Sequence, residues 1–415
     1  MGRENPAYDV KSNYRHKLCE VNIMIKLIKG AKVYSPKYLG VKDVLIVGDR
    51  IGAIEDNIDF IENINVEVEI IDGTNNILVP GFIDSHVHIL GGGGEGGFKT
   101  RTPEITLSDI TKGGVTTVVG CLGTDGMSRT MTSLVAKARG LEEEGISTFI
   151  YSGSYRIPVT TITGDIMKDI MVVDKVIGVG EIAISDHRSS QPTIEEIKKL
   201  VADVRVGGIL SGKAGIVNIH LGDGKAMIKP LLDIVENTEI PYTQFLPTHM
   251  NRNSDLFEEG IKYAKNGGIL DFTTSSDPLF WEEGEVKASK GLKRCIDEGV
   301  PVKQITFSSD GQGSLPVFNE KKEFVGLRVG KVTTLFGEVK DAIKIDNVPF
   351  EDAISVITSN PASILKLARK GKIQKGYDAD LVLLKEETLD IEMVIARGQV
   401  MVEEGIVKVY GTFEE

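Results

Sequence analysis

The chain has 415 residues, of which 41% are hydrophobic and 26% are charged. This composition is too apolar for a disordered chain, and the length exceeds one small domain, although a single α/β barrel can take about 250 residues. The 60 acidic residues outnumber the 48 lysines and arginines, which gives a net charge of −12. That charge argues against non-specific binding to nucleic acid or to an anionic membrane, so we expect neither as a partner.

Residues 1–24 are polar and aperiodic, and we expect them to form an extension, with Met24 as an alternative start. They lack the apolar centre of a secretory signal, and the sequence contains no run of about 18 apolar residues. The cysteines at 19, 121 and 295 are scattered without a metal-like spacing, so we expect free thiols. These features predict a cytoplasmic protein.

Short β-type runs follow the extension, and similar runs return near the other end of the chain. The first group covers 25–28, 32–34, 44–47 and 66–71, and the second covers 379–384, 393–396 and 406–410. Glycine-containing turns separate the runs, which is typical of a small antiparallel sheet. Because chain ends tend to lie close together, we expect one small β-sandwich domain built from residues 25–79 plus 368–415.

Between these ends the pattern alternates strand, loop and helix. The eight candidate strands are 79–87, 115–121, 147–152, 176–182, 216–220, 242–249, 269–274 and 304–310. They are apolar throughout, as buried parallel strands should be, and helical patterns such as 130–144, 194–210 and 254–266 separate them. The sequence therefore predicts an α/β fold, a (β/α)8 TIM-type barrel over residues 80–367, with an active site where the strands end.

Four of the six histidines lie at the carboxyl ends of candidate strands. His86 and His88 are two residues apart on one strand, so both point into the barrel mouth, where two imidazoles can share a cation. An isolated His-x-His is usually coincidence, but His220 ends the fifth strand, His249 the sixth and Asp310 the eighth. Histidines that merely pack in a core would lie at scattered heights. The pattern therefore indicates a metal centre.

Five ligands are more than one tetrahedral zinc ion requires, so we expect a second metal and a bridging group. Glu181 ends the fourth strand and is the carboxylate available for the bridge; the alternative is an ion pair with a neighbouring arginine or lysine. Two zinc ions lower the pKa of a bridging water from 15.7 to about 7. Asp310, beside that water, could take its proton.

Several motifs resemble the amidohydrolase superfamily of metal-dependent barrels. The resemblance to the superfamily rests on residues 80–88, which read Pro-Gly-Phe-Ile-Asp-Ser-His-Val-His, on the later metal-ligand candidates, and on the tail segments 360–362 and 376–381. More narrowly, five segments resemble the isoaspartyl dipeptidases within it, namely 91–97, 154–156, 183–188, 247–252 and 308–314. The resemblance extends from about Ile25 to the end of the chain.

The resemblance implies two zinc ions per subunit. The implied ligands of the first ion are His86, His88 and Asp310, and those of the second are His220 and His249. The best-known members bridge the metals with a carboxylated lysine, and Glu181 stands at that position in this chain. Its side chain is shorter, so we expect Gly180 to let the backbone move inward. Tyr155 matches the family's tyrosine that stabilises the developing oxyanion.

The resemblance also implies which residues bind the substrate. A β-aspartyl dipeptide carries one free α-ammonium and two free carboxylates. Glu95 matches the ammonium-binding residue, with backbone groups of Gly93 and Gly94 beside it. The matched carboxylate-binding residues are Arg188, Arg252 and Ser314, and Thr124 supplies a further polar contact. Arginine suits this task because its planar fork binds a carboxylate through two parallel hydrogen bonds. Each charge taken alone is more commonly a solvated surface group.

The resemblance therefore implies hydrolysis of β-aspartyl (isoaspartyl) dipeptides by a hydroxide bound to two zinc ions, in a homo-oligomer for which an octamer is one candidate. A cyclic-amide hydrolase such as a dihydroorotase or hydantoinase is the first alternative, and a metal-free scaffold is the second. The glycine run 91–97 resembles a phosphate loop, but no lysine with serine or threonine follows at the required spacing. His187 stays outside the predicted site, because its loop neighbours explain it equally well.

Overall fold

The structure is a computed structural model that describes residues 24–59, 67–319 and 323–414. The expected extension and Cys19 lie outside the described residues, apart from Met24. Among the described residues, none of the helices combines the length and the apolar character that crossing a membrane would require.

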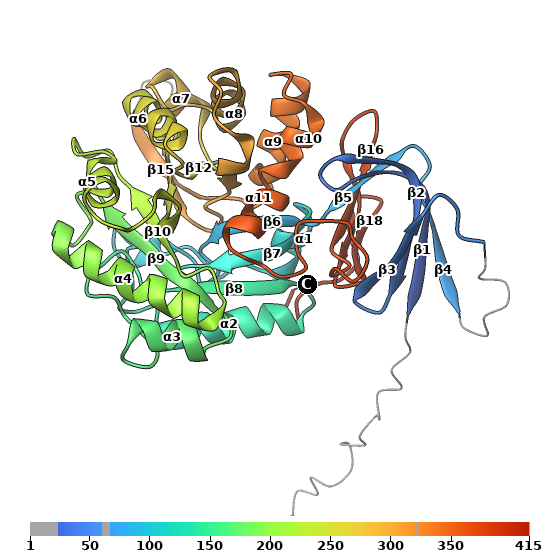
Figure 1. Ribbon diagram of the computed structural model, residues 1–415, viewed down its shortest axis with the longest axis horizontal. Helices are drawn as coiled ribbons and strands as arrows, with labels where there is room; N and C mark the ends of the chain where they lie inside the picture. The colour runs from blue at the N-terminus through green and yellow to red at the C-terminus, as the bar shows by residue number, and fades with distance from the viewer. Residues whose placement is uncertain (1–23, 60–66, 320–322, 415) are drawn as a thin grey trace, which may run out of the picture.

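A nine-stranded sheet joins the two ends of the chain, as predicted (Figure 1). Its strands from the first part of the chain are β1 (Ile25–Tyr34), β2 (Tyr38–Val47), β3 (Arg50–Glu55), β4 (Val68–Asp72) and β5 (Asn76–Pro80). Those from the last part are β16 (Leu381–Lys385), β17 (Ile391–Ala396), β18 (Gln399–Glu403) and β19 (Ile406–Val407). The join is the antiparallel pairing of β16 with β5, in which Leu381 faces Pro80. The β-rich domain therefore needs both ends of the chain.

Eight parallel strands form the barrel. They are β6 (Phe82–Val87), β7 (Val115–Gly120), β8 (Ser147–Ser152), β9 (Val176–Ile184), β10 (Ile216–Leu221), β11 (Phe245–Thr248), β12 (Leu270–Thr273) and β13 (Ile305–Ser308). The first six make one continuous sheet and the last two a pair. Two contacts close the ring: Val87 bridges Gly311 in parallel, and the Met250 amide donates to the Asp271 carbonyl over 3.2 Å. The predicted fold class is confirmed.

The expected strand 79–87 is two strands in the structure. Residues up to Pro80 belong to β5 of the small sheet, and β6 begins at Phe82. Gly81 marks the break, because a Cβ there would lie only 2.2 Å from the Thr116 hydroxyl oxygen. At the sixth barrel strand the first predicted residues instead form a 3-10 turn, Tyr242–Gln244. The predicted division into residues 25–79 plus 368–415 and 80–367 stays a prediction.

Helices surround the barrel on its outer side (Figure 1). They are α1 (Leu107–Thr111), α2 (Met131–Glu143), α3 (Ile166–Val172), α4 (Ile194–Ser211), α5 (Lys229–Asn237), α6 (Ser254–Lys265), α7 (Pro278–Glu282), α8 (Ala288–Asp297), α9 (Thr334–Lys344), α10 (Phe350–Ser355) and α11 (Ser359–Ile364). Polar residues cap the amino-terminal ends of two helices that the sequence predicted. Thr193 and Glu196 form a capping box at the start of α4, and Asn253 caps α6.

A β-hairpin that the sequence did not predict follows the last barrel strand. It consists of β14 (Ser314–Phe318) and β15 (Phe324–Val329). Phe318 packs against Phe280 of α7, with 5.9 Å between the ring centroids. The hairpin thus starts where the eighth barrel strand ends, on the side of the barrel where the predicted site lies.

Candidate active site

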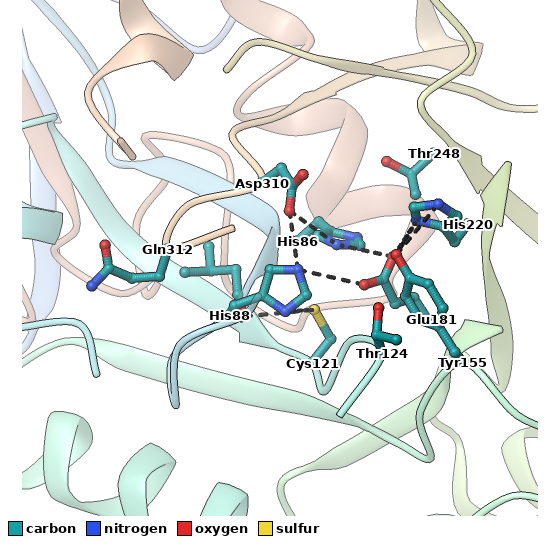
Figure 2. A network of polar contacts seen from close by, with 12 residues as sticks. His86, His88, Cys121, Thr124, Tyr155, Glu181, His220, Thr248, Asp310 and Gln312 are labelled. Atoms are coloured by element: carbon teal, nitrogen blue, oxygen red, sulfur yellow. Dashed lines mark hydrogen bonds and ion pairs between the residues drawn. The ribbon is translucent and has the colours of Figure 1, made fainter. Parts of the chain in front are cut away.

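The four histidines from the strand ends converge on one point, as Figure 2 shows for the three that it labels. His86 lies on β6 and His88 directly after it, His220 lies on β10, and His249 follows β11. All four are buried. The centroids of His86 and His88 are 5.3 Å apart, and those of His220 and His249 are 4.5 Å apart. Strands distant in sequence therefore bring the four rings together.

Glu181 on β9 lies between the two pairs of histidines (Figure 2). Its Oε1 is 3.4 Å from His88 Nε2, and its Oε2 is 3.4 Å from His86 Nε2 and 2.9 Å from His220 Nδ1. Burial by itself would raise the pKa of this carboxyl, but the positive charges of His86 and His220 hold it well below its usual range. Glu181 is therefore a central anion that reaches both pairs.

Gly180 lets β9 approach β10 closely beside Glu181. A Cβ at this position would lie 2.7 Å from the Asn218 Cβ and 3.0 Å from the Asn218 carbonyl oxygen. The pairing of β9 with β10 also shifts register between Val217 and Ile219, next to this contact. Only glycine fits such an approach, and the expected inward course of the backbone agrees with this geometry.

Asp310 completes the cluster from the end of the eighth strand. Its Oδ1 lies 3.0 Å from His88 Nε2 and 3.7 Å from His86 Nε2. The residue follows β13 in the left-handed region, with φ of 52°. Asp310 thus faces the first pair of histidines, on the side away from His220 (Figure 2).

The donor atoms of this cluster fit metal ions. Among the described residues, several buried polar atoms lack a hydrogen-bond partner, namely both ring nitrogens of His86, Oε1 of Glu181 and Oδ1 of Asp310. Buried polar atoms are rarely left in this state unless an ion or water satisfies them. Two sets of potential ligands lie within metal-binding distance, one with His86 and His88 and the other with His220 and His249, and Glu181 belongs to both. The presence of Glu181 in both sets suits a carboxylate that bridges two ions.

Cys121, which the sequence analysis treated only as a free thiol, belongs to this cluster. It follows β7, is fully buried and unpaired, and its Sγ lies 3.8 Å from His88 Nδ1. The first set of potential ligands includes it beside His86, His88 and Glu181. A signal was present in the sequence, because Cys121 directly follows a barrel strand as His249 does, but a single cysteine has no paired spacing that would mark it as a metal ligand.

Tyr155 lies at the edge of the cluster and is nearly fully buried. Its hydroxyl is 2.9 Å from His220 Nδ1 and 3.3 Å from His220 Nε2. Burial, with the negative charge of Glu181 nearby, raises the pKa of this phenol well above its usual value. The hydroxyl therefore keeps its proton at neutral pH and is available as a hydrogen-bond donor.

A cavity of about 510 Å³ opens above the cluster. The predicted residues that line it are His88, Gly93, Glu95, Thr124, Tyr155, Arg188, His220, His249, Arg252, Asp310 and Ser314. Gly94 lines an adjoining cavity that also touches Gly93, Glu95 and Thr124. His86 and Glu181 lie beneath the floor, where they are fully buried. The structure thus brings the predicted site residues together, while His187 points to solvent with 85% of its side chain exposed.

Oppositely charged side chains face each other inside the cavity. Glu95 Oε1 accepts a hydrogen bond from the Thr124 hydroxyl over 2.8 Å and lies 3.4 Å from Arg188 Nη1. The Arg188 guanidinium carbon lies 5.5 Å from the centre of the Tyr155 ring. Arg252 also lines the cavity, and its buried Nε has no hydrogen-bond partner among the described residues. Glu95, Arg188 and Arg252 therefore place a carboxylate and two guanidinium groups on the cavity wall, which also carries the carboxylates of Asp223, Glu283, Glu285 and Asp310.

Other lining residues were not predicted from the sequence. They are Asp223, Asn251, Asn253, Thr273, Ser275, Phe280, Glu283, Glu285, Leu315 and Pro316, together with Gly92, Gly123 and Gly313. Phe280, Leu315 and Pro316 make one part of the wall apolar. Burial raises the pKa of Glu285 to about 7. Apart from Thr273 at the end of β12 and Phe280 on α7, these residues come from loops and from the hairpin, where no periodic pattern marks a side chain as facing a cavity.

Comparison with known proteins identifies the family. The model of the amidohydrolase family matches residues 77–401. The chain belongs to this family. Two structures of the β-aspartyl dipeptidase from Fervidobacterium islandicum AW-1 resemble this amidohydrolase over nearly its whole length. One, in complex with the β-Asp-Leu dipeptide, is 49% identical, covers 93% of this chain and 98% of its own, and has a TM-score of 0.86. The other is 48% identical and has a TM-score of 0.84.

More distant relatives carry several activities. A deacetylase from Brucella anthropi is 22% identical over 81% of this chain and 78% of its own length. A dihydroorotase from Ehrlichia chaffeensis is 24% identical over 79% of this chain and 77% of its own. A D-hydantoinase structure shares the fold, with 16% identity and a TM-score of 0.66. The family assignment and the match to the dipeptidase structures make this protein a hydrolase.

Proposed function

We propose that this amidohydrolase cleaves β-aspartyl dipeptides. In such a dipeptide the bond to the second residue runs through the aspartate side chain, so the first residue keeps its α-ammonium and α-carboxylate free on one carbon atom. Glu95 and Arg188 lie 3.4 Å apart in the cavity and carry the complementary charges. A ligand with an ammonium and a carboxylate side by side can exchange this contact for one with each partner. This pair is the observation that carries the proposal.

The second carboxylate of the dipeptide requires a second cation. Arg252 provides it, since its Nε is buried and unpaired among the described residues and its side chain lines the same cavity. Ser314, at the start of the hairpin, offers a hydroxyl on the adjoining wall. The likeness to a dipeptidase bound to β-Asp-Leu supports the same substrate class.

The residues that would hold the metals are those of the buried cluster. We assign His86, His88 and Asp310 to one zinc ion, His220 and His249 to the other, and Glu181 to both. Bound zinc would activate a water molecule and polarise the amide carbonyl. Asp310 would take the proton of the attacking water and pass it to the leaving amine. Tyr155 would donate its phenolic hydrogen bond to the carbonyl oxygen as negative charge develops there.

Hydrolysis of β-Asp-Leu and α-Asp-Leu by the zinc-loaded protein tests the proposal, with amino-acid release as the readout. We expect cleavage of the β isomer alone, because only this isomer presents the free ammonium and carboxylate on one carbon. Cleavage of neither, together with ring opening of a dihydropyrimidine or hydantoin, would favour a cyclic-amide hydrolase. Metal analysis of the purified protein addresses the metal-free alternative directly.

Replacement of Glu95 by glutamine should reduce kcat/KM for β-Asp-Leu about 10- to 100-fold. The loss corresponds to one charge-assisted hydrogen bond to the ammonium, since an amide keeps the shape of the carboxylate without its charge. Steady-state kinetics of E95Q and the parent enzyme measure it. E282Q is the matched control, because Glu282 ends α7 and is not among the residues that line the cavity. Equal kinetics for E95Q and the parent enzyme would exclude this role for Glu95.

Activity of the zinc-loaded protein should not depend on bicarbonate. Glu181 presents its carboxylate directly, whereas a lysine at this position would first have to take up carbon dioxide. Rates measured in buffer freed of carbon dioxide and in buffer with added bicarbonate should agree. E181K is the comparison in which a dependence would arise. Rescue of an inactive, metal-loaded parent preparation by bicarbonate would contradict the assignment of Glu181 as the bridge.

The predicted zinc content, cytoplasmic location and homo-oligomeric state, with an octamer as one candidate, stay predictions. Elemental analysis measures the zinc content, and light scattering measures the oligomeric state.

A further inference from the structure

Asp186 is a buried carboxylate that connects two parts of the candidate site. It lies in the loop after β9, with only 3% of its side chain exposed. Its Oδ1 accepts hydrogen bonds from the backbone amide of Arg188 over 2.7 Å and from Arg188 Nε over 3.0 Å. Its Oδ2 accepts one from Arg188 Nη2 over 2.7 Å and lies 3.1 Å from His220 Nε2. Asp186 therefore contacts both a substrate-binding candidate and a metal-ligand candidate.

The two ring nitrogens of His220 face different surroundings. Nδ1 points to the cluster, 2.9 Å from Glu181 Oε2 and 3.0 Å from His249 Nε2. Nε2 points away from it, toward Asp186. A neutral imidazole has one N–H and one lone pair, and the bond made by one nitrogen decides which of the two the other presents. A hydrogen bond donated from Nε2 to Asp186 leaves the lone pair of Nδ1 directed at the cluster.

Arg188 Nη2 also approaches His220 Nε2, at 3.3 Å. Both groups are donors when Nε2 carries its hydrogen, and the shared acceptor, Asp186 Oδ2, offsets the repulsion between the two N–H groups. The contact of Arg188 with Glu95 is longer, at 3.4 Å, and involves a different guanidinium nitrogen. Asp186 thus makes the shortest contacts that orient the Arg188 fork within the cavity.

We propose that Asp186 is a positioning residue that sets the tautomer of His220 for metal binding and at the same time fixes the direction of the Arg188 fork. It touches neither the metal nor the substrate and acts through these two side chains. Carboxylates that accept from the second nitrogen of a metal-binding histidine orient the ring, and their loss lowers metal affinity 10- to 100-fold. The inference rests on the proposed metal site and deepens the proposed function.

Zinc affinity of the substrate-free protein is the first test. D186N keeps the size of the side chain, but its amide has only one accepting oxygen. Competition between a chromophoric chelator and the D186N protein should show one zinc ion bound about 10- to 100-fold more weakly, with the other unchanged. Two zinc ions held as tightly as in the parent protein would overturn the proposal. Because no substrate is present, this result is independent of whether β-aspartyl dipeptides are cleaved.

Two further variants separate positioning from other effects. R188M removes the guanidinium and leaves the Asp186 contact with His220, so it should keep both zinc affinities. D169N removes the charge of another fully buried carboxylate, which lies away from the cluster and accepts hydrogen bonds from the Ser152 hydroxyl and the Ile162 amide. This variant should lower thermal stability without lowering the affinity for zinc. Equal zinc loss in D186N and D169N would identify a general folding effect and overturn the proposal.

Kinetics at high zinc provide a readout that loss of stability alone would not move. With the weakened site refilled by excess zinc, the kcat of D186N for β-Asp-Leu should recover to within a fewfold of the parent value. KM should stay raised, as in R188M, because the misdirected Arg188 fork still binds the substrate carboxylate poorly. Recovery of both constants would show that Asp186 does not orient Arg188.

Discussion

Replacement of Tyr155 by phenylalanine is expected to lower turnover of β-Asp-Leu about 100- to 1000-fold, which is the usual effect of removing one oxyanion donor. The hydroxyl lies over the metal-ligand candidates, 2.9 Å from His220 Nδ1, and burial raises its pKa, so it carries a proton throughout the neutral range. The aromatic ring and its packing remain in Y155F. The measurement is kcat together with zinc content, which should stay at the parent level.

Tyr151 is the matched control for this variant. It lies on β8, the strand that precedes Tyr155, and is fully buried, but its hydroxyl has no hydrogen-bond partner among the described residues and it does not line the cavity. Y151F should therefore keep turnover within a fewfold of the parent enzyme. A Y155F enzyme as active as Y151F would rule out a role for Tyr155 as donor in the rate-limiting step.

Replacement of Asp310 by asparagine is expected to lower kcat about 100- to 10,000-fold, the range typical of a lost general base. Asp310 lines the cavity, and its Oδ1, 3.0 Å from His88 Nε2, accepts no geometrically formed hydrogen bond from any of the described residues, so it is the carboxylate placed to take a proton there. Asparagine keeps an oxygen for a metal but cannot accept that proton. Single-turnover rates at measured zinc occupancy test the prediction.

Zinc occupancy decides how the result for D310N is understood. Full occupancy with a large loss of kcat supports proton transfer by Asp310. A D310N enzyme with two bound zinc ions and kcat within tenfold of the parent value would instead assign the proton transfer to another group.

The sequence predicted the barrel well because its strands are buried on both faces. Strands such as β7 and β10 are buried throughout and rich in valine and isoleucine, so length and flanking glycines were enough to locate them. The predicted strand boundaries were less accurate. Residues 76–80 belong to β5 of the small sheet and are as apolar as β6, so only the break at Gly81 separates the two strands. The hairpin β14–β15 was missed because β14 is half-buried and β15 mostly exposed, and neither strand shows a clear alternation.

Candidate site residues were found where the topology alone determines their position. Strand ends in a parallel barrel meet at one edge, so His86, His220 and Asp310 could be grouped from sequence spacing. Arg188 and Glu95 lie on loops, and only the family resemblance pointed to them. Asp186 was overlooked because its role depends on the direction of two neighbouring side chains, which no local pattern encodes.

The pairing of β16 with β5 has a consequence for how the chain folds during synthesis. Leu381 and Pro80 are neighbours in the sheet although roughly 300 residues separate them, and all eight barrel strands lie between them in the sequence. A ribosome has therefore released the entire barrel segment before the edge of β5 can find its partner. Until then that edge is an exposed template for pairing with other chains, so β5 is the segment at which a chaperone would protect the nascent protein from aggregation.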